Sequence, residues 1–233
     1  MAFQTTRWSL VARAGRSGEE SRVALEELCS AYWKPVYVHV RGRGYSDEDA
    51  RDLTQEFFLF LIDKRIIARA DTNRGRFRSF LSATLRNFLT NEWDRKTARK
   101  RSGRYRAIRL DGLERASEMV ILADRTLTPD EQFDRAWAMS ILEHGLHKLR
   151  DEWVRNGQAD LFDALESRLT GDTRAELYRD IAERFGKTDT AIKLMVHRMR
   201  KRFGELIREE VEQTVSNGDD LDNELKYFKT ILG

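Results

Sequence analysis

Two prolines in 233 residues are the feature that most restricts how this chain can fold. Proline breaks helices, so its scarcity leaves room for long helical segments. Apolar residues recur at helical spacings, and few stretches alternate in the way that half-buried strands require. We therefore predict an all-α fold, with two small helical domains joined by a charged linker and a helix-turn-helix in the second domain.

The predicted helices divide the chain into segments. Residues 1–18 form an N-terminal segment, 19–105 a first helical domain, 106–129 the linker, 130–208 a second helical domain, and 209–233 an acidic C-terminal extension. Ser46 and Thr128 are predicted N-caps, because each precedes a helical stretch with acidic residues in its first turn. The apolar stripe of the first long helix, residues 19–41, consists of Val23, Leu25, Leu28, Tyr32, Val36 and Val40.

Charge is segregated along the chain, although the formal net charge is only +3. Residues 95–109 carry eight basic side chains and no acidic one, and residues 193–202 form a second basic cluster. Residues 111–134 and 209–224 are mainly acidic. A single charged run is commonly a solvated helix face, but alternating blocks are typical of interaction segments. We expect the acidic part of the linker to shield the basic surfaces in the free protein.

A helix rich in aromatic residues is predicted from Phe77 to Trp93 and leads directly into the first basic block. Aromatic side chains beside a basic track suit single-stranded DNA, because bases stack and the backbone is neutralised. Asn87 can both donate and accept hydrogen bonds, as contact with a base edge requires. The alternative is an ordinary surface asparagine, with most of the aromatic residues in the core.

The C-terminal half predicts two helices, 174–185 and 189–208, joined by a turn at Gly186 and capped at Thr188. Such a pair can be a plain core element, but the basic outer face favours binding in a DNA major groove. The residues expected to face inward are Ile192, Val196, Met199 and Phe203. The residues expected to face outward include Thr190, Lys193, His197, Arg200 and Lys201.

Other classes of protein have little support. His144 and His147 beside Glu143 could ligate a metal, but no third strong ligand is near. The sequence has no glycine-rich phosphate loop and no nucleophile with a paired base, so neither an enzyme nor a cofactor is expected. The single cysteine, the absence of a signal-peptide core and the absence of a long apolar run predict a cytoplasmic protein without membrane insertion.

Three segments in this order resemble the extracytoplasmic-function (ECF) class of bacterial RNA polymerase sigma factors. The family motif D-x-x-D-L-x-Q-E-x-F is matched by residues 49–61, DARDLTQEFFLFL. The segment that melts and contacts the promoter −10 element resembles residues 74–101, RGRFRSFLSATLRNFLTNEWDRKTARKR. The helix-turn-helix that contacts the −35 element resembles residues 179–203, RDIAERFGKTDTAIKLMVHRMRKRF. The opening TTRWSLV also resembles the start of one ECF subgroup.

The resemblance implies three sets of site residues. The polymerase-binding set is Asp49, Asp52, Gln55 and Glu56. The −10 set is Asp71, Thr72, Asn73, Arg74, Asn87, Arg95, Lys96, Arg99, Lys100 and Arg101. Within this set, the loop at 71–75 and Asn87 would capture a flipped base. The −35 set is Thr188, Thr190, Lys193, Leu194, His197, Arg198 and Lys201.

The implied partners are core RNA polymerase, through its β′ clamp helices and β flap, and promoter DNA. Members of the family are often held by an anti-sigma factor, which is a further implied partner. The alternative is a sequence-specific helix-turn-helix regulator that acts without being a polymerase subunit. The sequence departs from the family at Leu194 and Met195, which we expect on the outer face of the helix 189–208, where small polar or basic residues are usual in the family. It also departs in the added length of residues 150–176 and 205–233.

Overall fold

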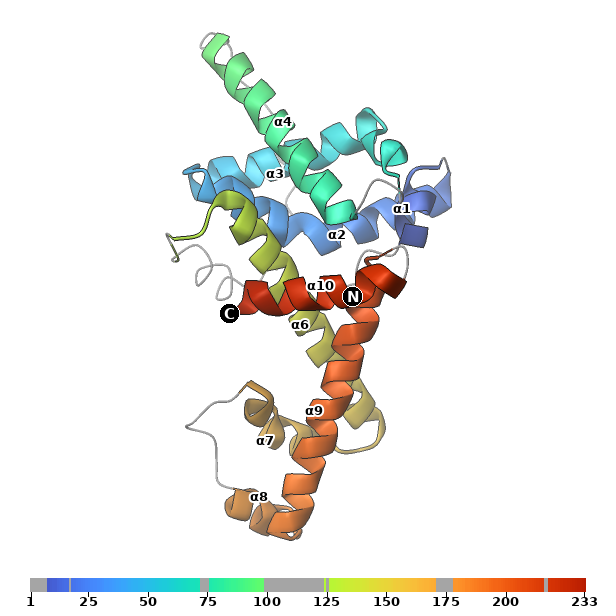
Figure 1. The fold of residues 1–233 in the computed structure, drawn as a ribbon, viewed down its shortest axis with the longest axis vertical. Helices are drawn as coiled ribbons and strands as arrows, with labels where there is room; N and C mark the ends of the chain where they lie inside the picture. The colour runs from blue at the N-terminus through green and yellow to red at the C-terminus, as the bar shows by residue number, and fades with distance from the viewer. Residues whose placement is uncertain are drawn as a thin grey trace. The chain divides into compact units, whose positions relative to one another are not determined.

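The computed structural model is helical in the residues that it describes, which are 8–16, 18–71, 76–98, 124, 126–170, 178–215 and 218–233 (Figure 1). Side chains are described for these residues except 8–9, 93–98, 170 and 218–220. The all-α prediction is confirmed over this part of the chain. None of these helices is both long and apolar enough to cross a membrane. The helices are α1 (Trp8–Ala14), α2 (Glu19–Gly42), α3 (Asp47–Asp63), η1 (Ile66–Arg69), α4 (Phe77–Ala98), α6 (Pro129–Arg155), α7 (Ala159–Thr170), α8 (Tyr178–Arg184), α9 (Asp189–Glu212) and α10 (Gly218–Leu232).

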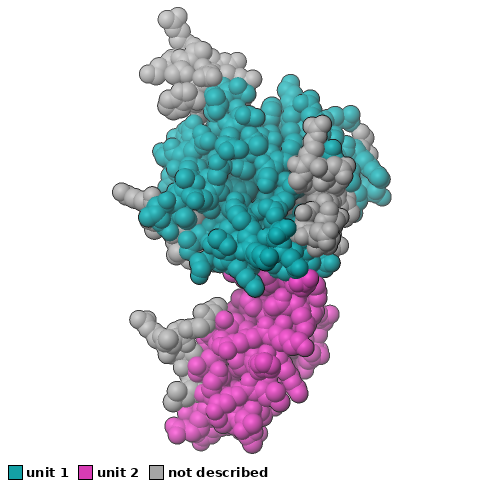
Figure 2. Space-filling model, viewed as in Figure 1, with its two compact units in different colours: residues 1–140, 211–233 teal, residues 141–210 magenta. Residues whose placement is uncertain are grey.

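Packing divides the chain into two compact units, which Figure 2 colours separately. Unit 1 comprises Met1–Ser140 and Val211–Gly233, and unit 2 comprises Ile141–Glu210. Both boundaries fall inside helices, in α6 and in α9. The start of α6 and the residues from Val211 onward therefore pack with the N-terminal unit, whereas the sequence assigns them to the second domain and to a separate extension. The predicted linker lies outside the described residues except at 124 and 126–129.

One face of α2 supplies much of the core of unit 1. Every fourth residue from Ala24 to Val40 is at most 2% exposed, and this spacing keeps all of them on one side of the helix. The predicted stripe is wrong at Val23, which is 44% exposed. Val23 precedes Ala24 by one position, which turns its side chain about 100° away from the buried face. The buried series is Ala24, Leu28, Tyr32, Val36 and Val40.

Helix α3 begins at its predicted N-cap. The Ser46 hydroxyl accepts a hydrogen bond from the Asp49 backbone N–H at 3.1 Å and donates to the Asp49 carboxylate at 2.7 Å. These bonds satisfy a donor that the first turn of a helix leaves unpaired. Ala50, Leu53, Phe57 and Leu61 recur at helical spacing and are at most 1% exposed, so they form the core face of α3.

The start of α6 is fixed by a capping box between Thr128 and Glu131. The Glu131 N–H donates to the Thr128 hydroxyl at 3.3 Å, and the Thr128 N–H donates to the Glu131 carboxylate at 2.7 Å. Asp130, in the first turn, accepts hydrogen bonds from Ser82 at 2.8 Å and from Arg86 at 3.1 Å. The predicted cap is therefore confirmed, and the start of α6 is bound to α4.

A buried histidine joins α2 to the start of α6. His39 has a fully buried side chain, and its Nδ1 lies 3.0 Å from the Pro129 carbonyl oxygen. The Arg43 Nε–H donates to the other ring nitrogen, Nε2, at 3.3 Å. Burial lowers the pKa of His39 to about 4. The ring is therefore neutral near pH 7, with the proton on Nδ1 donated to Pro129.

A buried ion pair attaches α10 to unit 1. The Arg78 side chain on α4 is 5% exposed, and its guanidinium lies 3.2 Å from the Glu224 carboxylate, which is 1% exposed. Asp134 on α6 lies 3.4 Å from the same guanidinium, which also stacks on Trp137 at 4.6 Å and on Tyr227 at 4.5 Å. Part of the acidic extension is therefore packed into the N-terminal unit, where Glu224 is one of two carboxylates that pair with the buried Arg78 guanidinium.

Unit 2 packs the second part of α6 with α7, α8 and α9 around an apolar cluster. A break at Gly157 separates two of these helices: α6 ends at Arg155, Gly157 has a φ of 69°, and α7 begins at Ala159. Glycine is favoured at this left-handed position because it has no Cβ. The fully buried members of the cluster are Leu149, Phe162, Leu165, Ile181 and Ile192.

Candidate nucleic-acid interface

A tight turn orients α9 against α8. Gly186 has a φ of 60°, and its N–H donates to the Glu183 carbonyl at 3.2 Å. The Lys187 N–H donates to the Ala182 carbonyl at 2.8 Å, which completes a Schellman-type helix end. The Thr188 hydroxyl then accepts from the Ala191 N–H at 3.1 Å, so Thr188 is the N-cap that the sequence predicts for α9.

The inner face of α9 is part of the core of unit 2. Ile192, Val196 and Met199 are at most 2% exposed, as expected, and Phe203 packs partly against the same cluster. Met195 also packs against this cluster, although the sequence places it beside Leu194 on the outer face. That expectation is wrong, because Met195 precedes Val196 by one position and its side chain reaches the edge of the core.

The opposite face carries the residues that the resemblance predicts to contact the −35 element. Thr188, immediately before the helix, is exposed. The other six lie at i, i+3, i+4, i+7, i+8 and i+11, which is one side of a helix. We call these six residues the outer stripe of α9. They are Thr190, Lys193, Leu194, His197, Arg198 and Lys201, and all of them are exposed.

The outer stripe is cationic. Lys193 forms an i, i+4 ion pair with Asp189 at 2.7 Å, and this hydrogen bond raises the pKa of the lysine. Lys201 lies 4.0 Å from Glu205. Arg198 makes no ion pair with any residue that the structure describes. Exposed pairs of this kind are weak and easily exchanged, so the three cations are accessible to an anionic ligand.

Two other arginines of the second basic cluster serve the fold instead. Arg200, expected on the outer face, donates to the Arg168 carbonyl at 2.7 Å and so holds the C-terminal end of α7. Arg202 donates to Glu152 on α6 at 2.8 Å. That hydrogen bond raises the pKa of the arginine and lowers the pKa of Glu152. The basic cluster therefore divides into cations that face solvent and cations that hold helices together.

On α4 the structure places one predicted −10 residue outward. Asn87 is exposed, whereas its neighbours Phe88 and Leu89 are buried. Asp71, before the helix, is also exposed. Arg95 and Lys96 lie on α4, but their side chains are outside the described residues. The remaining predicted −10 residues, Thr72, Asn73, Arg74, Arg99, Lys100 and Arg101, are outside the described residues.

Two polar residues of α4 that the sequence analysis did not select form a small cluster with the start of α6. Arg86 is exposed and Ser82 is half-buried, and both bond to the Asp130 carboxylate at the start of α6. The Ser82 and Arg86 donors that bind the Asp130 carboxylate could equally bind a phosphate oxygen. The only signal in the sequence is the spacing of four between a hydroxyl and an arginine on one helix face, which is too common to be diagnostic.

The predicted polymerase-binding residues share the solvent side of α3. Asp49 and Asp52 are exposed, and Gln55 and Glu56 are half-buried. Asp49 also has the structural role at the Ser46 N-cap. The structure therefore brings the four residues together on α3, and leaves Asp52 and Gln55 as the better probes of a docking function.

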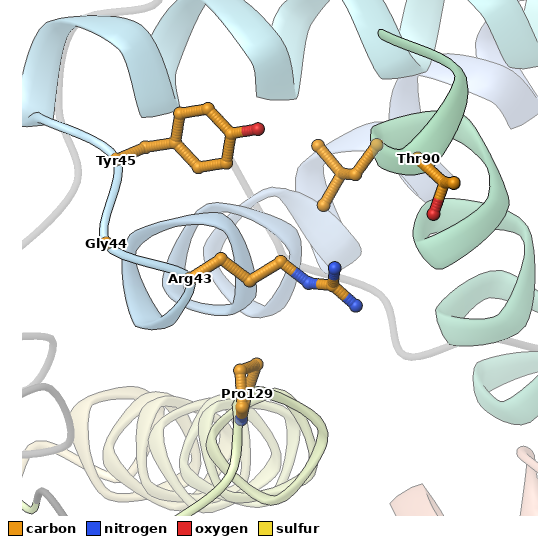
Figure 3. Close-up of a pocket in the computed structure, with 6 residues that line it drawn as sticks. Arg43, Gly44, Tyr45, Thr90 and Pro129 are labelled. Carbon is orange, nitrogen blue, oxygen red and sulfur yellow. The ribbon is translucent and has the colours of Figure 1, made fainter. Parts of the chain in front are cut away.

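A hollow of about 570 Å³ lies in unit 1 between the end of α2, α4 and the start of α6 (Figure 3). The Arg43 side chain extends from α2 toward α4 within this hollow. No predicted site residue is among the lining residues that the structure describes. These residues are Arg43, Gly44, Tyr45, Leu89, Thr90 and Pro129.

The histidines considered as metal ligands lie in a different setting. His144 is buried and its Nε2 lies 3.3 Å from the Glu210 carboxylate, which also binds Lys148. His147 is exposed. Within the part of the chain that the structure describes, no three His, Cys, Asp or Glu side chains are grouped to hold a metal ion. His144 therefore has a structural partner between α6 and α9.

Comparison with known proteins adds no relative. No protein-family model, curated protein or solved structure matches this chain.

Proposed function

We propose that this chain is an ECF-type sigma factor, which binds core RNA polymerase in the cytoplasm, recognises the −10 and −35 promoter elements and directs transcription initiation. One observation carries the proposal: the six outer-stripe residues of α9 are exposed together on one helix face, behind a tight turn from α8. The order of α8, turn and α9 is that of a helix-turn-helix, in which the second helix enters the major groove.

The dimensions and charge of α9 support the −35 role. A helix with its side chains is about 10–12 Å across, close to the width of the major groove of B-DNA. Lys193, Arg198 and Lys201 can neutralise phosphates, while Thr188 and Thr190 at the N-terminal end can donate to base edges or phosphates. The inner face stays in the core, so binding needs no unfolding of α9.

The α3 and α4 helices support the remaining roles less directly. The exposed Asp49 and Asp52 match the family motif that docks on the β′ clamp helices. Asn87 is exposed on α4 and precedes the basic block, as capture of an unpaired base requires. In this proposal unit 1 binds polymerase and the −10 element, and unit 2 binds the −35 element.

The decisive experiment combines the full chain with purified core RNA polymerase and a genomic template library. We expect promoter-specific run-off transcripts and co-purification with the β′ subunit. The variant Asp52→Ala with Gln55→Ala should lose most of both, with its helix content unchanged. The matched control is Asp63→Ala, which removes one exposed charge from the end of α3.

The same experiment distinguishes a sigma factor from the alternative, a helix-turn-helix regulator. An ordinary helix-turn-helix regulator would bind duplex DNA through α9 but would neither co-purify with core polymerase nor stimulate transcription from any template. In that case the α3 variant and the Asp63→Ala control would behave alike. That outcome would overturn the sigma-factor proposal while leaving DNA binding in place.

A further inference from the structure

We propose that Leu194 makes apolar contact with thymine methyl groups, so that the DNA site bound by α9 contains thymine at one or two defined positions. The inference depends on the proposed binding of DNA by α9. It goes further because it assigns a base preference to the one residue of the outer stripe that cannot form a hydrogen bond.

The position of Leu194, rather than its exposure alone, carries the inference. A single exposed leucine is common on protein surfaces. Leu194 is 48% exposed and makes no part of the core, unlike Ile192 and Met195 on the same helix. Thr190 and Arg198 lie four residues before and after it on the same face. Leu194 is therefore at the centre of the outer stripe, where a helix in a major groove lies closest to the bases.

The chemistry of the major groove identifies the DNA group that Leu194 contacts. Along the floor of the major groove each base presents hydrogen-bonding groups, and thymine adds a C5-methyl group. Leucine makes favourable contact only with apolar atoms, and it would leave the donors and acceptors of other bases unsatisfied. The longer side chains of Lys193 and Arg198 can reach phosphates, which leaves the leucine side chain to contact thymine methyl groups.

The surroundings of Leu194 argue against a protein partner as the occupant. A protein-binding site of this kind normally shows a contiguous apolar patch. On α9, Leu194 is the only large apolar side chain that is exposed among the described residues, and its stripe neighbours are cationic or polar. DNA, a polyanion whose thymines carry methyl groups, complements this arrangement of cations around the Leu194 side chain.

The test uses the full chain and duplex DNA. A random-sequence duplex pool is selected for binding, and the tightest duplex is synthesised with thymine and with uracil at each thymine position in turn. Uracil differs from thymine only in lacking the methyl group. We expect uracil at one or two adjacent positions to weaken binding about four-fold for each methyl group lost. The variant Leu194→Ala should bind the thymine duplex about as weakly as the wild type binds the uracil duplex. It should no longer distinguish thymine from uracil.

The control is Leu59→Ala on α3, where a leucine of similar exposure (45%) lies outside the outer stripe. This variant should keep the full thymine preference, and Leu194→Met should keep part of it. If a specific duplex is bound but uracil has no effect, or has the same effect in Leu194→Ala, the inference is wrong and DNA binding stands. Loss of polymerase binding in Leu194→Ala without any uracil effect would assign the leucine to a protein partner and also overturn it. If the free chain selects no duplex, the selection is repeated with the chain bound to core RNA polymerase, because the linker is expected to shield the basic surfaces of the free protein. If no duplex is selected there either, the proposed function fails together with the inference.

Discussion

The two helices proposed to contact DNA, α4 and α9, use arginine in opposite ways. On α4, Arg78 is buried against Glu224 and lies between two aromatic rings. On α9, Arg198 is exposed in the outer stripe and makes no ion pair with any described residue. The same side chain is a structural element in one helix and an accessible cation in the other. Formal charge along a sequence is therefore a poor measure of the charge that a ligand can reach.

The same contrast recurs within α9 itself. Lys193, Arg198 and Lys201 lie on the outer stripe, whereas Arg202, one position further, donates to Glu152 on α6. The boundary between accessible and structural cations is set by the direction of each side chain from the helix axis. A binding helix can thus have a basic outer face and an ion-paired inner edge within a few residues.

The largest effect should come from breaking the buried pair. Arg78→Met leaves the buried Glu224 carboxylate with only the half-buried Arg76, 2.6 Å away, as its cation, and we expect a loss of about 3 kcal/mol in the free energy of unfolding, the lower end of the range for a broken buried pair. Chemical denaturation of the full chain measures this change. The control is Arg22→Met, since Arg22 forms an exposed pair with Glu19 at 2.9 Å and such pairs contribute at most about 1 kcal/mol. A similar effect from both variants would remove the distinction between the buried and the exposed arginine.

Acid should destabilise unit 1 through His39. The pKa of this histidine is about 4 in the folded protein and about 6.5 when exposed. Between these values the unfolded state binds more protons, so stability falls as the pH is lowered from about 6.5 toward 4. The full loss would be about 3 kcal/mol, and the titration of ordinary carboxylates overlaps it only below about pH 5. Denaturation of the wild type and of His39→Gln at several pH values measures it, and parallel curves for the two proteins would contradict the prediction.

The smallest expected effect is that of salt concentration on DNA binding. If residues 95–106 neutralise about six phosphates, the logarithm of the binding constant should fall against the logarithm of the salt concentration with a slope of about −5. Arg198→Gln should reduce the size of this slope by about one without changing the denaturation midpoint. Fluorescence anisotropy with a labelled duplex measures both slopes. An unchanged slope would mean that the exposed arginine does not contact a phosphate.

Local features of this fold could be predicted from the sequence, because their partners lie within a few residues. The N-caps Ser46, Thr128 and Thr188 each bond to a backbone N–H three residues ahead. The outer stripe of α9 follows from helical spacing alone. Helical periodicity does not fix where the edge of a buried face lies. The predictions for Val23 and Met195 therefore failed, because each residue lies one position from a buried one.

The pairing of Arg78 with Glu224 could not be predicted in the same way. The two residues are 146 positions apart, and a charged residue in an amphipathic pattern is assigned to the solvent side. For the same reason the acidic end of the chain looks like a separate extension, although Glu224 is buried in unit 1. The site on α4 is affected too, since the bonds from Ser82 and Arg86 to Asp130 join helices from separate predicted domains.

The position of Glu224 has a consequence for the order in which the protein can be made. Bacterial and other ribosomes add about 5–20 residues per second, so roughly 7–30 seconds separate the synthesis of Arg78 from that of its partner. During that interval the helices from α1 to α4 carry a cation whose final burial site is incomplete. The nascent N-terminal unit should therefore stay open to chaperones and proteases until α10 emerges, while unit 2, which is continuous in sequence, can fold first.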